Sequence, residues 1–346
     1  MIFPSFKTLT LFPLLVLIAG PAAAESNIKG FREAVITTAR PEAWEMFFLE
    51  DAGWERRYAD VADGALKELW RLPAEARIRE ALYANPGTDR GFVRVVTLEG
   101  VPQAQIRSND QPWDTGGHFD FNLRVAGLEA LSVRLMARGW QAASDPVQFT
   151  FGPFEVKEWI VRGPDGVRLA LIERVAPPLK GWPHLKITSR VFNATQTVRD
   201  MPASLAFYRD VLKFETYLEH RGPSRESGPN VLGLPHNLAA EIPRHVFILH
   251  PVGINDGSVE LLAFDGATGR DFGAHATPDN LGVSALRFPV DDLDAVLSRL
   301  RSAGLTPEAG PMVLGLAPYG AVRIFAIRAP EGAWLEFFEP QPGRSR

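Results

Sequence analysis

The sequence predicts an α+β fold of four similar modules arranged in two tandem domains. Helical patterns in the two halves of the chain match each other at an offset of 160 to 166 residues, and each half ends in short apolar runs and a turn. A Pro-rich stretch between the halves, Val175 to His184, is typical of a domain boundary. Because self-similarity at a fixed offset indicates repeated units, we expect domains at residues 28–175 and 185–342, joined by a linker at 176–184.

The helix of each module is predicted by apolar residues on one face. The segments Gly127–Trp140 and Asp292–Leu305 carry apolar residues three or four positions apart, and both reach a glycine suited to a left-handed C-terminal position. The segment Ala39–Trp54 matches the segment Val198–Phe214, in which Asp200 is a predicted N-cap. Each module is therefore expected to contain a strand, a helix and about three further strands.

The first 24 residues have the layout of a secretory signal peptide. One Lys and an apolar run precede Ala22, Ala23 and Ala24, and signal peptidase accepts such a small-x-small pattern. An uncleaved membrane anchor is the alternative interpretation, although no stop-transfer flank follows. We therefore expect an exported protein, periplasmic or secreted, that keeps no membrane segment after cleavage.

Composition narrows the partners of the remaining chain. Without residues 1–24 the chain keeps 36 basic and 41 acidic residues, and it contains no Cys. Disulfides, thiolate metal ligands and a Cys nucleophile are thus excluded. An excess of acidic residues without a basic patch gives no reason to bind nucleic acid. A small molecule is the expected partner, and a homodimer is compatible with the sequence.

Several stretches of the C-terminal half resemble a known superfamily. TVRDMPASLAFYRDVLKFE, GSVELLAF, FPVDDLDAVLSRLRSAGL and EGAWLEFFEP follow one another in the order and spacing of the vicinal oxygen chelate superfamily. This superfamily includes glyoxalase, extradiol dioxygenases and bleomycin-resistance proteins. The resemblance covers residues 185–342 and is weaker over residues 28–175. It implies βαβββ modules, two to a domain, with a pocket between the two modules of each domain.

The resemblance also implies four ligand positions for a divalent metal in each domain. In the C-terminal domain these positions hold Asn193, Glu260, Ala285 and Glu336, so two carboxylates match and both expected His ligands are missing. We expect Glu260 and Glu336 to be catalytic and to bind the metal together with Asn193. The metal could be manganese, iron, zinc or magnesium, and these oxygen ligands suit a hard ion such as manganese or magnesium better than zinc. A further ligand would come from His245, His250 or His275.

The N-terminal domain departs further from the pattern. Its four positions hold Glu33, Arg94, Asp120 and Ala170. Arg94 would repel a cation and is expected to pair with Glu33 or Asp120. His118 lies two residues before Asp120 on the same strand face and could replace it as a ligand after a small register shift.

Three interpretations of the C-terminal pocket stay open. The first is a metal-dependent lyase, isomerase or dioxygenase acting on a small oxygenated organic molecule. In the second, the enzyme works without a metal, and repulsion between Glu260 and Glu336 raises one carboxyl pKa to make a general base. The third is a non-catalytic drug or metabolite binding protein of the bleomycin-resistance type. A long insertion between Glu219 and Ile242 either covers the pocket or is plain surface.

Overall fold

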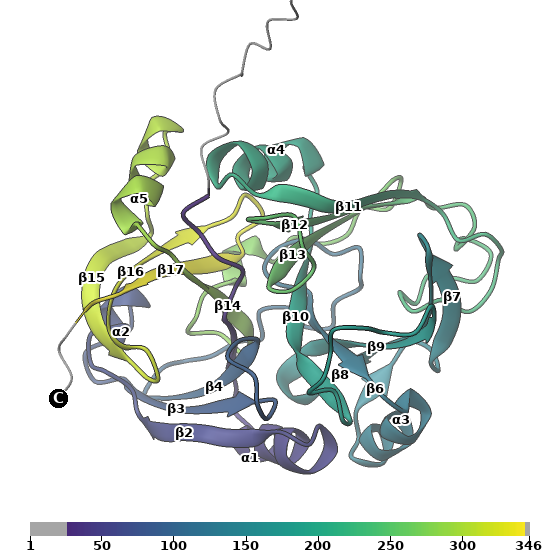
Figure 1. Cartoon of the computed structure of the whole chain (residues 1–346), viewed down its shortest axis with the longest axis horizontal. Helices are drawn as coiled ribbons and strands as arrows, with labels where there is room; N and C mark the ends of the chain where they lie inside the picture. The colour runs from purple at the N-terminus through teal and green to yellow at the C-terminus, as the bar shows by residue number, and fades with distance from the viewer. Residues whose placement is uncertain (1–25, 343–346) are drawn as a thin grey trace, which may run out of the picture.

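The strands form two curled sheets that lie side by side (Figure 1). The computed structural model describes residues 26–342. Along the chain, a strand, a helix and three or four further strands recur four times. We call these units module A (β1 to β4), module B (β5 to β9), module A′ (β10 to β13) and module B′ (β14 to β17). The predicted α+β class and the four-module organisation are therefore confirmed.

The first sheet has eight strands. Its spatial order is β15 (Ala309–Leu316), β16 (Gly320–Arg328), β17 (Trp334–Pro340), β14 (Gly282–Pro289), β1 (Glu33–Thr37), β4 (Phe92–Glu99), β3 (Arg77–Ala84) and β2 (Glu55–Val61).

The second sheet has nine strands. Its spatial order is β11 (Glu215–Gly222), β12 (Arg244–His250), β13 (Ser258–Phe264), β10 (Thr188–Thr197), β5 (Asp120–Val125), β9 (Arg168–Ala176), β8 (Phe154–Arg162) and β6 (Gln141–Ala142), with β7 (Val147–Phe151) paired to β8.

The pairing of modules differs from the one that the two-domain division implies. We expected module A to pair with B, and A′ with B′. Instead β1 pairs with β14, and β5 pairs with β10, both antiparallel. Module A thus shares a sheet with B′, and module B shares a sheet with A′. Repeated modules present similar first strands, so a repeat pattern cannot indicate which of these edges will meet.

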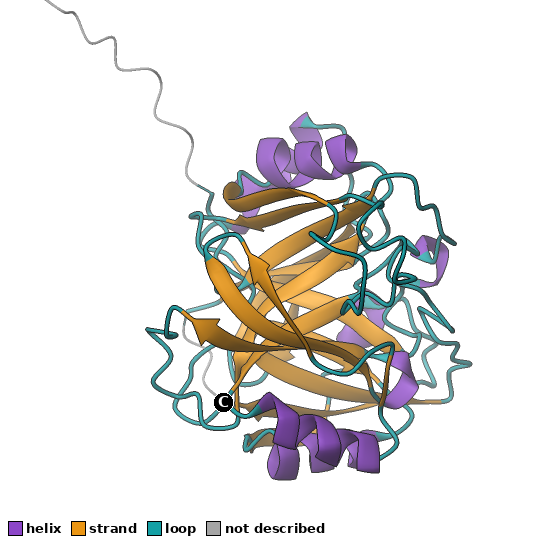
Figure 2. Cartoon of the chain, turned by 90° about the vertical axis from the view of Figure 1, so that its right-hand side faces the viewer, coloured by secondary structure: helices purple, strands orange, loops and turns teal. Residues whose placement is uncertain are grey.

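The helices α1, α3, α4 and α5 lie at two opposite ends of the molecule, whereas α2 lies beside the first sheet. Figure 1 places α1 and α3 at one end and α4 and α5 at the other, and the view in Figure 2, turned by 90°, shows helices at both ends again. The side chain of Asp200 accepts a hydrogen bond from the backbone N–H of Ala203, so Asp200 is the N-cap of α4, as predicted. The helical elements are α1 (Pro41–Met46), η1 (Phe47–Asp51), α2 (Leu66–Leu69), α3 (Leu128–Ala137), η2 (Pro164–Gly166), α4 (Met201–Leu205), η3 (Ala206–Val211), η4 (Gly273–His275) and α5 (Leu293–Ser302).

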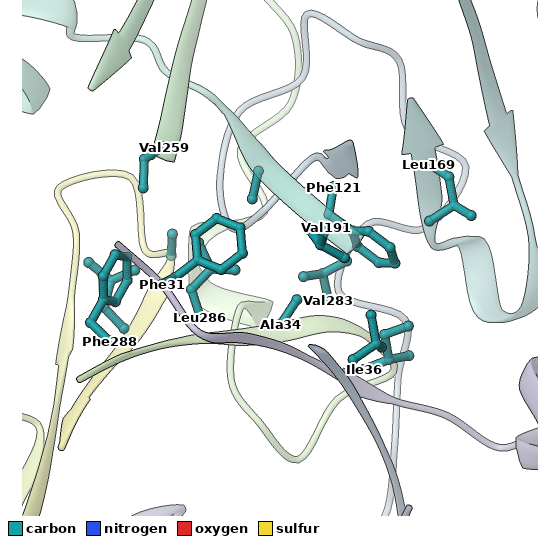
Figure 3. Close-up of a cluster of buried hydrophobic side chains, with 14 of the residues drawn as sticks. Phe31, Ala34, Ile36, Phe121, Leu169, Val191, Val259, Val283, Leu286 and Phe288 are labelled. Carbon is teal, nitrogen blue, oxygen red and sulfur yellow. The ribbon is translucent and has the colours of Figure 1, made fainter. Parts of the chain in front are cut away.

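The main hydrophobic core contains side chains from both sheets (Figure 3). Strand β1 shows how it is built, because residues of a strand alternate between its two faces. Ala34 and Ile36 belong to this core, whereas Val35 belongs to a separate cluster on the opposite side of the sheet. We call that opposite side the first outer face, and the corresponding side of the second sheet the second outer face.

Each outer face is covered by a different segment. On the first outer face, Leu66, Leu69 and Trp70 of the α2 region pack in one apolar cluster with strand residues. On the second, Val231 and Leu232 pack against apolar strand residues. These two residues belong to the predicted insertion, which therefore covers a sheet face. Among residues 26–342, no helix is long and apolar enough to cross a membrane.

Candidate functional site

Glu336 is buried on the first outer face. Strand β17 places Leu335 and Phe337 in the main core and turns Glu336 to the other side. Its Oε2 lies 2.5 Å from Nε of Arg287. Its Oε1 accepts hydrogen bonds from the indole N–H groups of Trp70 at 2.6 Å and Trp334 at 3.2 Å. The charge of this carboxylate is therefore compensated inside the protein.

The ion pair extends into a larger network. Arg287 Nη1 lies 2.7 Å from Oε1 of Glu33. Arg94 donates to both oxygens of Glu33, at 2.9 and 3.1 Å, and also pairs with Glu80 at 2.9 Å. Burial favours the neutral form of Glu33, but the two guanidinium groups outweigh it and hold the pKa of Glu33 below its usual value. The predicted pairing of Arg94 with Glu33 is thus confirmed, and the network fills the first outer face.

The second outer face carries three acidic side chains without such compensation. Glu260 on β13 and Asp120 on β5 are both register partners of Thr195 on β10, which lies between them. Glu158 on β8 belongs to the same acidic group. No ion pair joins any of the three to a basic side chain within residues 26–342. We call Asp120, Glu158 and Glu260 the acidic triad.

Burial and mutual repulsion keep the acidic triad protonated to unusually high pH. Burial, together with the charges of Asp120 and Glu158, raises the pKa of Glu260 to about 8 against the opposing charge of Arg124. Burial and the charge of Asp120 likewise raise the pKa of Glu158 to about 8. The pKa of Asp120 rises to about 6 through burial, against the hydrogen-bonding effect of Thr195. Two neutral carboxyl groups and one largely ionised one therefore share this face at pH 7.

Arginine side chains complete the second outer face. The guanidinium of Arg124 lies 4.1 Å above the ring of Phe192, and that of Arg174 lies 3.9 Å above the ring of Phe154. Burial, together with the charge of Arg174, lowers the pKa of Arg124 to about 10. Within the described residues, Nε of both arginines and Oδ1 of Asp120 are buried without a hydrogen-bond partner. Buried polar atoms are normally paired, so these groups favour a bound polar ligand or ordered water.

The structure separates the two predicted catalytic carboxylates. Glu260 belongs to the second sheet and Glu336 to the first, because module A′ and module B′ do not pair with each other. The expectation that both line one pocket is therefore corrected. Asp120, which we assigned to a different domain from Glu260, is the residue that meets it. Sequence reasoning missed Glu158 and Arg124, because each lies in a strand that contains other polar and charged residues, which left no distinct signal.

Asn193 and the histidines are engaged in other contacts. The side-chain oxygen of Asn193 accepts from Asn122 Nδ2 at 2.9 Å, and its Nδ2 donates to Ser258 Oγ at 3.0 Å. His118 contacts the backbone oxygen of Trp334, and His245 contacts Glu219. The ring of His250 accepts from the backbone N–H of Val252, and His275 lies exposed in η4.

Comparison with known proteins identifies the C-terminal half. Residues 190–337 match the model of the Glyoxalase/Bleomycin resistance protein/Dioxygenase superfamily. This part of the chain belongs to that superfamily. The superfamily predicted from the sequence is thus confirmed. A search of curated protein sequences gives no significant match.

Solved structures of this superfamily share the fold over most of the chain. Glyoxalase I from Zea mays is 13% identical, with a TM-score of 0.58, and the match covers 90% of this chain and 92% of that one. A Bacillus subtilis protein whose assignment as a dioxygenase is provisional is 12% identical, with a TM-score of 0.56. That match covers 91% of this chain and 86% of the other. At such identities the likeness shows the fold alone.

Members of the superfamily typically bind a divalent metal, so the donor set of this chain is informative. Of the predicted ligands, Glu336 is bound by Arg287 and two indoles, and the Asn193 oxygen already accepts from Asn122. Within residues 26–342, no three His, Asp or Glu side chains form a group that could hold a metal ion. The predicted set of Glu260, Glu336 and Asn193 therefore does not fit a metal, and the chemistry below uses the carboxyl groups alone.

Proposed function

We propose that the second outer face is an active site that moves protons on a small oxygenated organic molecule, as a lyase or an isomerase does. The observation that carries this proposal is the acidic triad, in which Asp120 is buried and Glu158 and Glu260 are half-buried, without ion pairs and beside an incompletely bonded Arg124. Membership of the superfamily supports it, because these proteins bind small molecules. The residues proposed to act on the substrate are Glu260, Glu158 and Asp120.

The raised pKa values suit general acid and base catalysis. A carboxyl group with a pKa near the working pH can both donate and accept a proton. Glu260 and Glu158, with pKa values of about 8, are proton donors at neutral pH, while Asp120, with a pKa of about 6, is a proton acceptor. An acid and a base facing one ligand are what proton abstraction next to a carbonyl group requires.

The arginines indicate the charge of the substrate. Arg124 and Arg174 each have an Nε that is buried without a partner. A guanidinium binds a carboxylate through two parallel hydrogen bonds. The proposed substrate class is therefore a small hydroxy or keto acid whose carboxylate is held by Arg124. The insertion residues Val231 and Leu232 would shield it from water.

Proton exchange in D₂O tests the proposal without knowledge of the product. The protein is incubated with a panel of small hydroxy and keto acids, and deuterium incorporation at the carbon beside the carbonyl is followed by NMR. We expect exchange with at least one acid, and a loss of at least ~100-fold in Glu260→Gln, typical of a missing acid–base group. The exposed Glu215→Gln is the control.

Two other results would replace the proposal. Saturable binding of an acid, seen as a thermal shift, without any exchange would favour the non-catalytic binding protein. Exchange that is equal in the wild type and in Glu260→Gln would remove the proposed role of the acidic triad.

We also propose that the protein is exported and that its mature chain begins at Glu25. The support is the sequence of residues 1–24, which lie outside the described residues. Intact-mass measurement on protein from the periplasm and from the culture medium tests this. Full-length protein confined to the cytoplasm would contradict it.

A further inference from the structure

A groove lies between η3 and α5, away from both outer faces. Its volume is about 800 Å³ and it is open to solvent. Figure 1 shows α4 and α5 at the same end of the molecule. The groove is lined by Asn27, Asp210, Val211, Lys213, Ala295, Ser298, Arg299, Ser302 and Ala303.

The internal repeat supplies a second copy of this helix contact, between η1 and α3 at the opposite end. There, Arg138 lies 2.7 Å from the carboxylate of the buried Asp51. Arg134 lies 3.6 Å from the same carboxylate and also donates to the backbone oxygen of Asp51 at 3.4 Å. In this copy, two arginines thus share one buried acid, and Arg138 also pairs with Glu50 at 2.8 Å.

Backbone hydrogen bonds align the two copies. Trp54 N–H donates to the Phe48 oxygen in one copy, and Phe214 N–H donates to the Tyr208 oxygen in the other. This equivalence puts Val211 in the place of Asp51.

The helices align in the same way. Arg138 N–H donates to the Arg134 oxygen, and Ala303 N–H donates to the Arg299 oxygen. Arg299 is therefore the counterpart of Arg134, and Ala303 is the counterpart of Arg138. The groove exists where Val211 and Ala303 have replaced a carboxylate and a long arginine.

Arg299 has no carboxylate in the place where its counterpart Arg134 has that of Asp51. Its Nε and Nη2 are shielded from water and have no hydrogen-bond partner within residues 26–342. The charge of Asp292 acts on Arg299 without a hydrogen bond between them, and a shielded cation without a hydrogen-bonded counter-charge is unfavourable. Lys213 adds a second positive charge to the lining and Asp210 one negative charge, so the groove is net positive.

We propose that this groove is a binding site for a small oxyanion, a carboxylate or phosphate group, held by the guanidinium of Arg299 and by Lys213. The hydroxyls of Ser298 and Ser302 and the amide of Asn27 line the same groove and can donate to the remaining anion oxygens. The site is separate from the acidic triad, and its occupancy does not depend on the proposed catalytic function.

Calorimetric titration of the mature protein tests the site, with inorganic phosphate and, separately, acetate as probes at constant ionic strength. We expect saturable binding of at least one of them, weakened at least tenfold in Arg299→Gln. Arg134→Gln is the matched control, because Arg134 already forms an ion pair with Asp51. The affinity of this variant for the anion should stay within twofold of the wild type. Acetate that binds while phosphate does not would identify a carboxylate ligand, and the reverse a phosphate ligand.

Val211→Asp tests the same site without removing the arginine. The new carboxylate recreates the contact between Asp51 and Arg134, without a counterpart of Arg138, so it should occupy Arg299, raise the melting temperature and abolish anion binding. Binding that persists unchanged in Val211→Asp and Arg299→Gln, or no saturable binding by the wild type, would overturn the proposal. A loss of deuterium exchange in Glu260→Gln, with anion binding intact, would show that the two sites are independent.

Discussion

The two outer faces use equivalent positions of the repeat in opposite ways. Arg94 in module A and Glu260 in module A′ hold the same position in the last strand of their modules. On the first outer face, Arg94 joins Arg287 to neutralise Glu33, and Glu336 is bound by Arg287. On the second, Glu260 adds a third acid to a face where one arginine opposes it. The charge placed at this position therefore differs between a face whose acids are held in ion pairs and a face whose acids have none among residues 26–342.

The largest expected effect concerns the first outer face. Glu336→Gln leaves Arg287 with one acidic partner instead of two, and breaking a buried ion pair costs ~3–5 kcal/mol. Urea unfolding at pH 7 measures the loss of free energy of unfolding. Glu339→Gln on the same strand is the control and should change this free energy by less than ~0.5 kcal/mol. A loss in Glu336→Gln below about 1 kcal/mol would mean that the ion pair does not support the sheet.

The second expected effect is the pH dependence of the wild type. Glu260 and Glu158 have a pKa of about 8 in the folded protein and an ordinary pKa of 4.5 in the unfolded chain, so the folded state binds more protons between these values. The free energy of unfolding should therefore fall as the pH rises from 4.5 to 8, by roughly 2–3 kcal/mol in total, because both side chains are only half-buried and solvent screens part of the effect. Glu33, whose pKa is lowered, acts in the opposite direction and loses its contribution on acidification.

The third prediction is that removing a carboxylate changes the free energy of unfolding in opposite directions on the two outer faces. Glu260→Gln removes an acid whose ionisation is unfavourable in the folded state, so it should raise the free energy of unfolding at pH 8 by ~1–2 kcal/mol. At pH 4.5 and below the side chain is neutral in both states, and the gain should nearly vanish. Thermal unfolding at both pH values checks this. Destabilisation at pH 8 would indicate that Glu260, like Glu336, has a partner in the folded protein.

The smallest expected effect is the loss of one indole donor. Trp70→Phe keeps most of the apolar contact in the first outer face but removes the N–H that Glu336 accepts at 2.6 Å. A hydrogen bond to a charged group contributes ~1.5–3 kcal/mol. The second indole, Trp334, can still donate, so the cost should lie near the low end of this range. Combining Trp70→Phe with Glu336→Gln should cost less than the sum of the two, which a double-mutant cycle measures.

The sequence was sufficient to predict the modules but not their pairing. Apolar spacing and glycines such as Gly139 and Gly304 depend on local backbone geometry, so the helices and the fourfold repeat could be predicted. Which first strand meets which is decided by contacts over more than 240 residues, as between Val35 and Ala285. No local pattern encodes that choice.

The candidate site was predictable only in part. Glu260 could be found, because a carboxylate in an apolar strand is costly unless it has a role. The same argument selected Glu336, whose partners Trp70 and Arg287 come from distant elements. Unless it is known which modules share a sheet, a carboxylate that has an ion-pair partner cannot be distinguished from one that has none. Glu158 was missed for a related reason, since β8 belongs to the same module as Asp120 but shares a sheet with Glu260 only through the exchanged pairing.

Because each sheet contains modules from both halves of the chain, the pairing also determines whether either half could fold as a separate fragment. Residues 28–175 contain β1 and β5, and neither strand has its antiparallel partner in that half. Each half alone would expose the edges of two first strands, whereas the two halves together restore both sheets. Two separately encoded fragments should therefore complement each other into one folded unit. The single chain is thus equivalent to an intertwined dimer of its own halves.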